Sequence, residues 1–132
     1  ETYIMNYFYI SIFAFMGAIS RYSISLLFGS SHHQLSTMFI NIMGSFFIII
    51  ASELLTKVKY IPNELITGIT IGFFGAFTTF SIYSYESLEY LLNQQYIFFL
   101  FYSLGSVIVS LLAAWSAYII CNKIENFRGE PQ

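Results

Sequence analysis

The chain has 132 residues, of which seven are acidic and five are basic, so only 9% of the sequence is charged. Soluble domains carry roughly 25% charged residues, and a soluble fold of this size could not bury a sequence that is 57% hydrophobic and 20% aromatic. This composition excludes an ordinary cytosolic enzyme and a disordered chain. A formal charge of −2 offers no basic patch to a nucleic acid, and the single cysteine, Cys121, excludes a disulfide framework.

Long uncharged stretches predict four membrane-spanning helices. Arg21 is the only charged residue between Glu1 and Glu53, and residues 65–85 and 90–122 carry no charge. A helix needs about 20 mostly apolar residues to cross the hydrocarbon layer of a bilayer. An outer-membrane barrel would instead alternate apolar and polar residues, which these runs do not do. The predicted spans cover residues about 4–28, 37–56, 64–92 and 96–121.

Polar connectors join the spans, and the chain over 1–132 is expected to form a single all-α transmembrane domain with a solvated tail at 122–132. With four spans, both termini and the loop 57–63 lie on the same side of the membrane. That side holds four of the five basic residues, namely Lys57, Lys59, Lys123 and Arg128. Because Lys and Arg near span ends stay in the cytoplasm, both termini are predicted inside.

Small and polar residues form one stripe on the first span. They recur at steps of three and four residues: Ser11, Ala14, Ala18, Arg21 and Ser25. Small residues let helices approach closely in a membrane, so this stripe predicts a packing face. Arg21 is the only cation inside a span, and such a group needs a partner or a wet vestibule. The carboxylate of Glu86 is one possible partner, and a position at the membrane edge is the other interpretation of Glu86.

Two other spans carry polar side chains with two interpretations each. The Asn41 amide offers donors and acceptors, either to a permeating ion or to a neighbouring helix. The fourth span places Tyr102, Ser106, Ser110 and Ala114 at four-residue steps. The hydroxyl groups of the first three residues either bind a passing ion in succession or form hydrogen bonds with carbonyls of their own helix. We interpret His32 and His33 as solvated residues of a polar loop at 30–36, because no further metal ligand lies near them.

The third span contains a segment that favours a broken helix. Gly68, Gly72 and Ala76 are spaced for packing, and the stretch 72–81 is rich in glycine, threonine and phenylalanine, which are poor helix formers. A break frees backbone carbonyls, which a membrane tolerates only where they are buried or wet. A continuous helix with a kink is the alternative. Because four helices enclose little space, a path for ions also requires an oligomer.

These motifs resemble the Fluc (CrcB) family of fluoride channels. GAISRYS at 17–23 is similar to the family's G-A-x-x-R-Y motif, and INIMGSF at 40–46 is similar to its N-x-x-G-S segment. GFFGAFTTFSIYSYE at 72–86 resembles the third-helix motif G-F-x-G-x-F-T-T-F-S-x-F-S-x-E. The resemblance covers residues 13–114. It implies a channel that exports fluoride across the bacterial plasma membrane, and no enzyme activity is expected.

The resemblance also implies an assembly and a set of functional residues. Family members are antiparallel dimers with two pores and a structural sodium ion (Na⁺) at the dimer centre, held here by main-chain carbonyls of Gly75 and Thr78. Their partners are fluoride, membrane lipid, and a second copy or a related sibling subunit. The implied fluoride pathway comprises Asn41, Phe80, Tyr83, Ser106 and Ser110. The implied vestibule or architectural residues are Arg21, Glu86, Thr79 and Tyr102.

Two departures from the family pattern bear on the pore. Tyr83 stands where the family has a second phenylalanine, and Ala114 stands at the last hydroxyl position of the fourth span. Either change is expected to weaken the pore lined by that residue. Two other functions stay open: a small four-span multidrug-type cation exporter and a tetraspan scaffold without transport. The exporter needs a carboxylate deep in the first helix, where this chain has Arg21 instead.

Overall fold

The computed structural model describes residues 2–128, and within that range the chain is helical and contains no strand. The helices are α1 (Thr2–Phe28), the 3₁₀ turn η1 (Ser30–His32), α2 (His33–Leu55), α3 (Asn63–Thr67), the π-helical turn η2 (Gly68–Phe73), α4 (Phe74–Phe77), α5 (Phe80–Leu92) and α6 (Tyr96–Arg128). Four stretches are long and apolar enough to cross a membrane: Ile4–Phe28, Ser30–Leu55, Asn63–Leu92 and Tyr96–Phe127. The predicted all-α membrane fold with four spans is confirmed.

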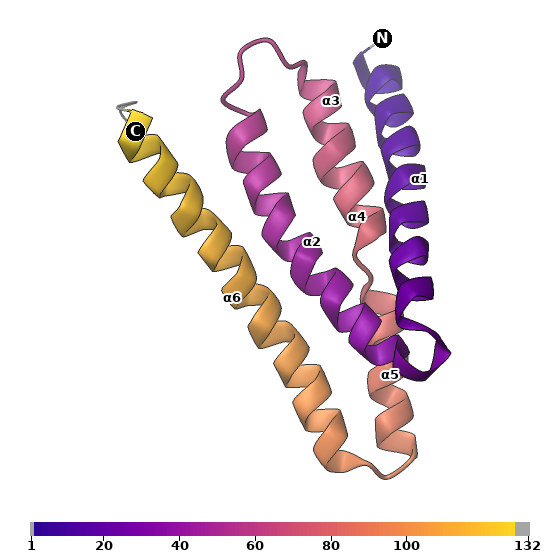
Figure 1. Cartoon of the computed structure of the whole chain (residues 1–132). Coiled ribbons are helices and arrows are strands. Elements are labelled where there is room, and N and C mark those ends of the chain that lie inside the picture. The colour runs from indigo at the N-terminus through magenta and orange to yellow at the C-terminus, as the bar shows by residue number, and fades with distance from the viewer. Residues whose placement is uncertain (1, 129–132) are drawn as a thin grey trace.

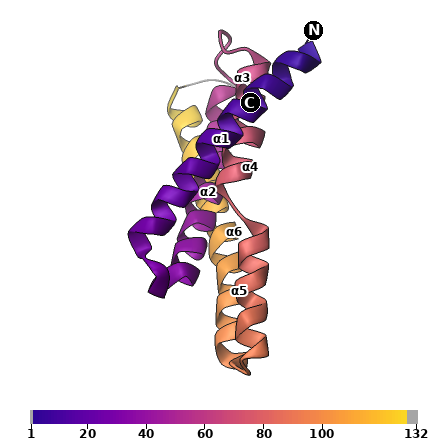
Figure 2. The same cartoon turned by 90° about the vertical axis from the view of Figure 1, so that its right-hand side faces the viewer.

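The helices lie roughly lengthwise beside one another, with the ends of the described chain at the same end of the molecule (Figure 1). The loop between α2 and α3 lies at that end too, and the connections between α1 and α2 and between α5 and α6 lie toward the other end. α6 packs along α2, while α1 packs along η2 and α4. α5 and the start of α6 project beyond the turn between α1 and α2 (Figure 2).

Close helix contacts depend on glycine at several positions, among them Gly68 and Gly72 of the third span, which lie against α1. A Cβ atom on Gly17 of α1 would collide with the backbone of Phe73 in η2, and a Cβ on Gly44 of α2 would collide with the Thr78 side chain. Small residues at such crossings let backbones approach and gain van der Waals contact, which is the main packing force between helices in lipid. On α1 the closest approach occurs at Gly17, next to Ala18 of the predicted packing stripe.

Two predicted connectors are more helical than expected. α2 begins at His33 instead of residue 37, so most of the predicted polar loop is helical. α6 continues into the predicted tail as far as Arg128, and residues 129–132 lie outside the described chain. The extension of α6 is stabilised by the turn that follows α2, because Lys57 in that turn forms ion pairs with Glu53 of α2 and with Glu125 of α6.

The third span consists of helical segments separated by two extended residues. α4 ends at Phe77 and α5 begins at Phe80. Thr78 has φ −75° and ψ 160°, and Thr79 has φ −146° and ψ 123°, so both have extended backbone. The Thr79 hydroxyl then caps α5 by accepting a hydrogen bond from the Ile82 amide. Threonine suits this position, because its side chain competes with the backbone for hydrogen bonds at helix ends.

Candidate functional site

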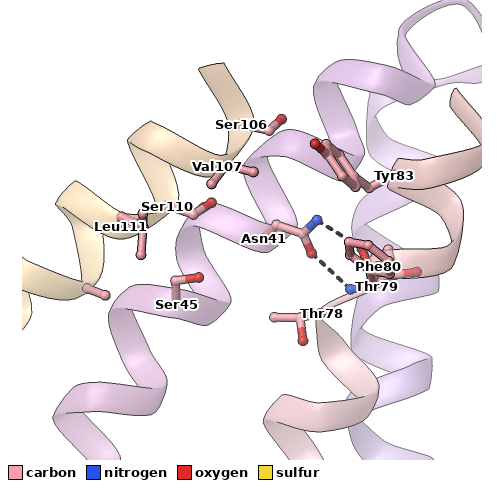
Figure 3. Close-up of a pocket in the computed structure, with 11 residues that line it drawn as sticks. Asn41, Ser45, Thr78, Thr79, Phe80, Tyr83, Ser106, Val107, Ser110 and Leu111 are labelled. Carbon is pink, nitrogen blue, oxygen red and sulfur yellow. Dashed lines mark hydrogen bonds between the residues drawn. The ribbon is translucent and has the colours of Figure 1, made fainter. Parts of the chain in front are cut away.

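A groove of about 340 Å³ lies between α2, α6 and the extended residues of the third span (Figure 3). It brings together all five residues of the predicted fluoride pathway, which are far apart in the sequence: Asn41, Phe80, Tyr83, Ser106 and Ser110. Ser45, Thr78, Thr79 and Ala114 also line it, with Val107 and Leu111 supplying apolar wall. Donor groups and aromatic rings therefore share one small surface, and their role in conduction stays a prediction.

Asn41 joins α2 to the extended segment through both ends of its amide. Its Nδ2 donates to the Thr79 carbonyl oxygen at 2.9 Å, and its Oδ1 accepts from the Thr79 backbone amide, also at 2.9 Å (Figure 3). This pairing satisfies a backbone unit that has left the helical hydrogen-bond pattern. Each amide end retains further hydrogen-bonding capacity, because NH₂ has a second hydrogen and the oxygen a second lone pair. Asn41 can therefore fix the segment and still face a ligand in the groove.

The same contacts leave two backbone carbonyls without their helical donors. In a continuous helix, the amide of Thr79 would donate to the Gly75 carbonyl, and the amide of Ile82 would donate to the Thr78 carbonyl. Here the Thr79 amide donates to Asn41 and the Ile82 amide donates to the Thr79 hydroxyl. Gly75 and Thr78 are the two residues whose carbonyls the sequence analysis assigned to sodium. Their oxygen atoms are thus available to another partner.

Aromatic side chains form one wall of the groove. The Tyr83 ring lies between the rings of Phe80 and Tyr102, with ring centroids 5.8 and 5.7 Å away. Its hydroxyl donates to the Ser103 carbonyl of α6 at 2.9 Å. The hydroxyl that distinguishes Tyr83 from the family's phenylalanine is therefore occupied by the protein. Phe80 is 79% exposed in the single chain, so a large aromatic surface stands uncovered at the groove.

The hydroxyl groups of α6 fall into two kinds. Ser103 donates to the Phe99 carbonyl of its own helix. Ser106 is only 3% exposed, and its hydroxyl has no hydrogen-bond partner in the described chain. A buried hydroxyl without a partner is costly, so Ser106 has an unused donor at the groove. Ser110 lies one turn further along the groove, and Ala114 continues the line without a hydroxyl.

Glu86 is the centre of a second polar cluster. It is 2% exposed and accepts hydrogen bonds from Thr37 at 3.0 Å and from Tyr102 at 2.5 Å. The His33 Nδ1 lies 2.9 Å from Oε1, the same carboxylate oxygen that accepts from Thr37, while Tyr102 donates to Oε2. The expectation that His33 is merely solvated is therefore wrong. The expected partner Arg21 does not pair with Glu86, and Arg21 forms no ion pair with any residue in the range 2–128.

Sequence reasoning missed Thr37 and His33 as members of the site, although it placed Ser45 on the same face of the second span as Asn41. A signal for them is present, because Ser45, Asn41, Thr37 and His33 follow one another at four-residue steps. Residues at this spacing lie above one another on one face of a helix. α2 therefore carries a continuous polar line that starts in the groove, passes Glu86 and ends at the exposed first turn of the helix.

A second groove of about 540 Å³ has a different character. Its walls come from α1, α2 and the first half of the third span, and they consist of apolar side chains such as Ile24, Met43, Phe47, Phe73 and Phe77. Nothing in it can hydrogen-bond an ion through a side chain. Of the two grooves, the first is therefore the one with polar side chains in its wall.

Four apolar spans and a polar groove beside an extended segment define a multi-pass membrane protein equipped to bind or pass a small polar solute. Comparison with known proteins makes the class specific. Residues 8–118 match the family described as "CrcB-like protein, Camphor Resistance (CrcB)". The chain belongs to this family, which confirms the resemblance drawn from its motifs.

Similar proteins from bacteria extend over most of the chain. A Listeria monocytogenes protein named "Fluoride-specific ion channel FluC 2" is 30% identical over 126 residues, which cover 96% of this chain and 97% of the relative. A Bacillus cereus "Fluoride-specific ion channel FluC 1" is 36% identical over 111 residues, or 79% of this chain and 77% of the relative. A Geobacter metallireducens "Fluoride-specific ion channel FluC" is 34% identical over 109 residues, or 80% and 88%.

Proposed function

We propose that this chain is a subunit of a fluoride-selective channel that exports fluoride across the bacterial plasma membrane. The single observation that carries the proposal is the groove, which gathers Asn41, Ser106 and Ser110 with the rings of Phe80 and Tyr83. The names of the relatives support fluoride as the ion, and an ion channel of this kind is a transporter and not an enzyme.

The chemistry of the groove suits a small, strongly hydrated anion. Such an ion loses its water only where hydrogen-bond donors replace it, and amide and hydroxyl groups are such donors. Aromatic rings add to this, because the edge of a ring is electropositive and can face an anion. The Ser106 hydroxyl has no hydrogen-bond partner among the described residues, so it can donate to fluoride without losing a bond within the protein.

A cation exporter is the less suitable alternative. Exchange of protons for a cationic drug needs a carboxylate deep in the first span, but α1 carries no acidic residue and holds Arg21 instead. The buried carboxylate of the molecule, Glu86, is engaged by three neighbours, His33, Thr37 and Tyr102. A scaffold without transport leaves the unpartnered Ser106 and the groove unexplained.

The working unit in this proposal is an antiparallel dimer with two pores, formed by two copies or by this chain and a related sibling subunit. One chain exposes its groove along one side, where Phe80 is 79% exposed. A path for a dehydrated ion needs walls on all sides, because an uncovered side admits lipid or water. A second subunit supplies the missing wall, and membrane lipid covers the remaining apolar surface.

A structural sodium ion at the dimer centre fits the residues that the family pattern assigns to it. Carbonyl oxygens are ligands for hard cations, and Gly75 and Thr78 have carbonyls whose helical donors are diverted to Asn41 and Thr79. A Cβ atom on Gly75 would meet nothing within 4 Å in the single chain, so this face is open to a neighbour. When bound, the ion would supply fixed positive charge and link the two subunits.

Fluoride efflux from liposomes tests the proposed function. Purified protein is reconstituted into vesicles loaded with fluoride or with chloride, and efflux is measured with ion-selective electrodes. We expect rapid fluoride efflux and chloride efflux at the level of protein-free vesicles. Uptake of a lipophilic cation driven by a proton gradient, without fluoride efflux, would support the exporter instead. The absence of both activities would support the scaffold.

The sodium assignment has its own test in the substitution Gly75→Ala. The single chain has room for the methyl group, so an effect on assembly must arise between subunits. We expect the variant to elute as a monomer in sodium-containing detergent solution at concentrations at which the wild type is dimeric. Gly105→Ala is the control, because Gly105 also has open space around it and lies on α6, away from the extended segment. Equal dimerisation of the two variants would contradict the assignment.

A further inference from the structure

We infer that His33 forms the mouth of the anion pathway at the end of the molecule opposite the chain termini, and that protonation of its imidazole accelerates fluoride passage. The inference rests on the proposed channel function. It concerns a residue outside the groove, and it predicts a dependence on pH that the groove by itself does not require.

The first argument is position. One helical turn separates Asn41 in the groove from Thr37, and one further turn separates Thr37 from His33. α6 takes the same step from Ser106 to Tyr102, and both Thr37 and Tyr102 donate to Glu86. The Glu86 cluster therefore lies directly beyond the groove along two helices. His33 is the outermost member, with a side chain that is 47% exposed.

The second argument is charge. Glu86 is buried and, when ionised, places a negative charge beyond the end of an anion groove, where it repels an approaching anion. Its hydrogen bonds with Thr37 and Tyr102 come from neutral hydroxyl groups, which leave that charge uncompensated. His33 is the group in contact with Glu86 that can become a cation. An imidazolium at 2.9 Å would offset the carboxylate and leave the mouth neutral.

The surroundings contain no other compensating cation. Tyr83, Tyr90 and Tyr102 lie near the Glu86 carboxylate. Glu89 adds a second acid on α5, three residues after Glu86. On the turn before α2, His32 is exposed, and its side chain makes no hydrogen bond or ion pair among the described residues. α1 contributes Arg21, which forms no ion pair with either His33 or Glu86. His33 is therefore the residue that decides the charge at the mouth.

Fluoride efflux from reconstituted vesicles is measured with the same pH on both sides, at roughly pH 5.5 and 7.5. Protein-free vesicles at each pH supply the leak of neutral hydrogen fluoride, which is subtracted. We expect the wild type to be faster at the lower pH, up to about tenfold, as a charge at a channel mouth raises local anion concentration.

Two substitutions fix the charge at this position. His33→Gln is neutral at both pH values, and it should be slow at both. His33→Lys is positive at both, and it should be fast at both. His32→Gln is the matched control, since it removes a neighbouring histidine that does not contact Glu86, and it should keep the wild-type ratio. Size-exclusion chromatography confirms that each variant assembles as the wild type does.

The outcomes separate the inference from the function on which it rests. Wild-type fluoride efflux that is equal at both pH values, or a His33→Gln variant that keeps the wild-type ratio, would overturn the role of His33 and leave the channel intact. If His33→Gln does not assemble, His33→Lys is used instead, and a lysine variant that keeps the wild-type ratio of efflux at the two pH values would overturn the role of His33. A wild type without fluoride efflux at either pH would overturn the channel and the inference together.

Discussion

The serines of α1 form hydrogen bonds within their own helix, whereas the polar residues of the groove bond to another element or have no partner. Four hydroxyls of α1 donate to carbonyls three or four residues earlier in the same helix: Ser11, Ser20, Ser23 and Ser25. Ser106 of α6 is buried without a partner, and Asn41 of α2 reaches across to Thr79. A serine that bonds its own helix is compatible with lipid and has no free donor. From this contrast we expect α1 to act as a packing element and the groove surfaces of α2 and α6 to carry the function.

The largest effect is expected from Asn41→Asp, which replaces an amide with a carboxylate in the groove. The variant loses the Nδ2 donor to Thr79 and places a negative charge in the path of an anion. Two unit charges 4 Å apart repel by about 4 kcal/mol at an effective dielectric constant of 20. Fluoride efflux should therefore fall by about a hundredfold or more.

Asn41→Ala separates the two causes of this loss. It removes the hydrogen bonds to Thr79 without adding charge, so it should reduce fluoride efflux less than Asn41→Asp does. Undiminished efflux from a dimer in which both copies carry aspartate would show that Asn41 only packs helices. Asn41 would then have a packing role only, as the small residues of α1 do.

The second prediction tests the packing side of the comparison. Gly17→Ala should destabilise the protein, because its methyl group would collide with the Phe73 backbone, which cannot rotate away. Overpacking of this kind costs about 1–3 kcal/mol. Thermal unfolding in detergent should show a lower midpoint, while the assembled fraction should keep its fluoride efflux. Gly105→Ala is the control, and an equal midpoint for both variants would contradict the close contact.

The four spans and the members of the groove were predictable, but the neighbours of each polar residue were not. Periodicity and charge reveal the faces of a helix, and motif resemblance identified Asn41, Ser106 and Ser110 as one set. Neither reveals which helices pack together. The pair of Arg21 with Glu86, one of the two possibilities left open by the sequence, does not form within the chain because α1 packs on η2 and α4, whereas Glu86 faces α2 and α6.

His33 illustrates the same limit. Its contact with Glu86 joins residues 53 positions apart and depends on α2 beginning four residues before its predicted start. The early start is itself a tertiary effect, because Ser36 and Thr37 are buried in the first turns of α2. A polar segment whose sequence predicts a loop can be helical when its side chains contact neighbouring helices.

The third prediction compares two serines of the same helix. Ser106→Ala should lower fluoride efflux by about tenfold, the effect of losing a hydrogen bond worth about 1.4 kcal/mol to the permeating ion. Its thermal midpoint should not fall, because the hydroxyl has no partner within the described chain. Ser103→Ala is the matched control, since that hydroxyl bonds to Phe99 of its own helix. Equal efflux from the two variants would remove the distinction between free and self-bonded hydroxyls.

The smallest effect is expected from Tyr83→Phe, although the sequence pattern suggests that tyrosine weakens the pore. The Tyr83 hydroxyl donates to the Ser103 carbonyl, and the ring keeps its place between Phe80 and Tyr102. The substitution therefore leaves the ring in the groove, and fluoride efflux should change by less than about twofold. The lost hydrogen bond should lower stability by about 1 kcal/mol, visible as a lower thermal midpoint. A large gain in efflux would show that the hydroxyl obstructs the pathway, and that the groove of this chain is the weaker pore of a mixed dimer.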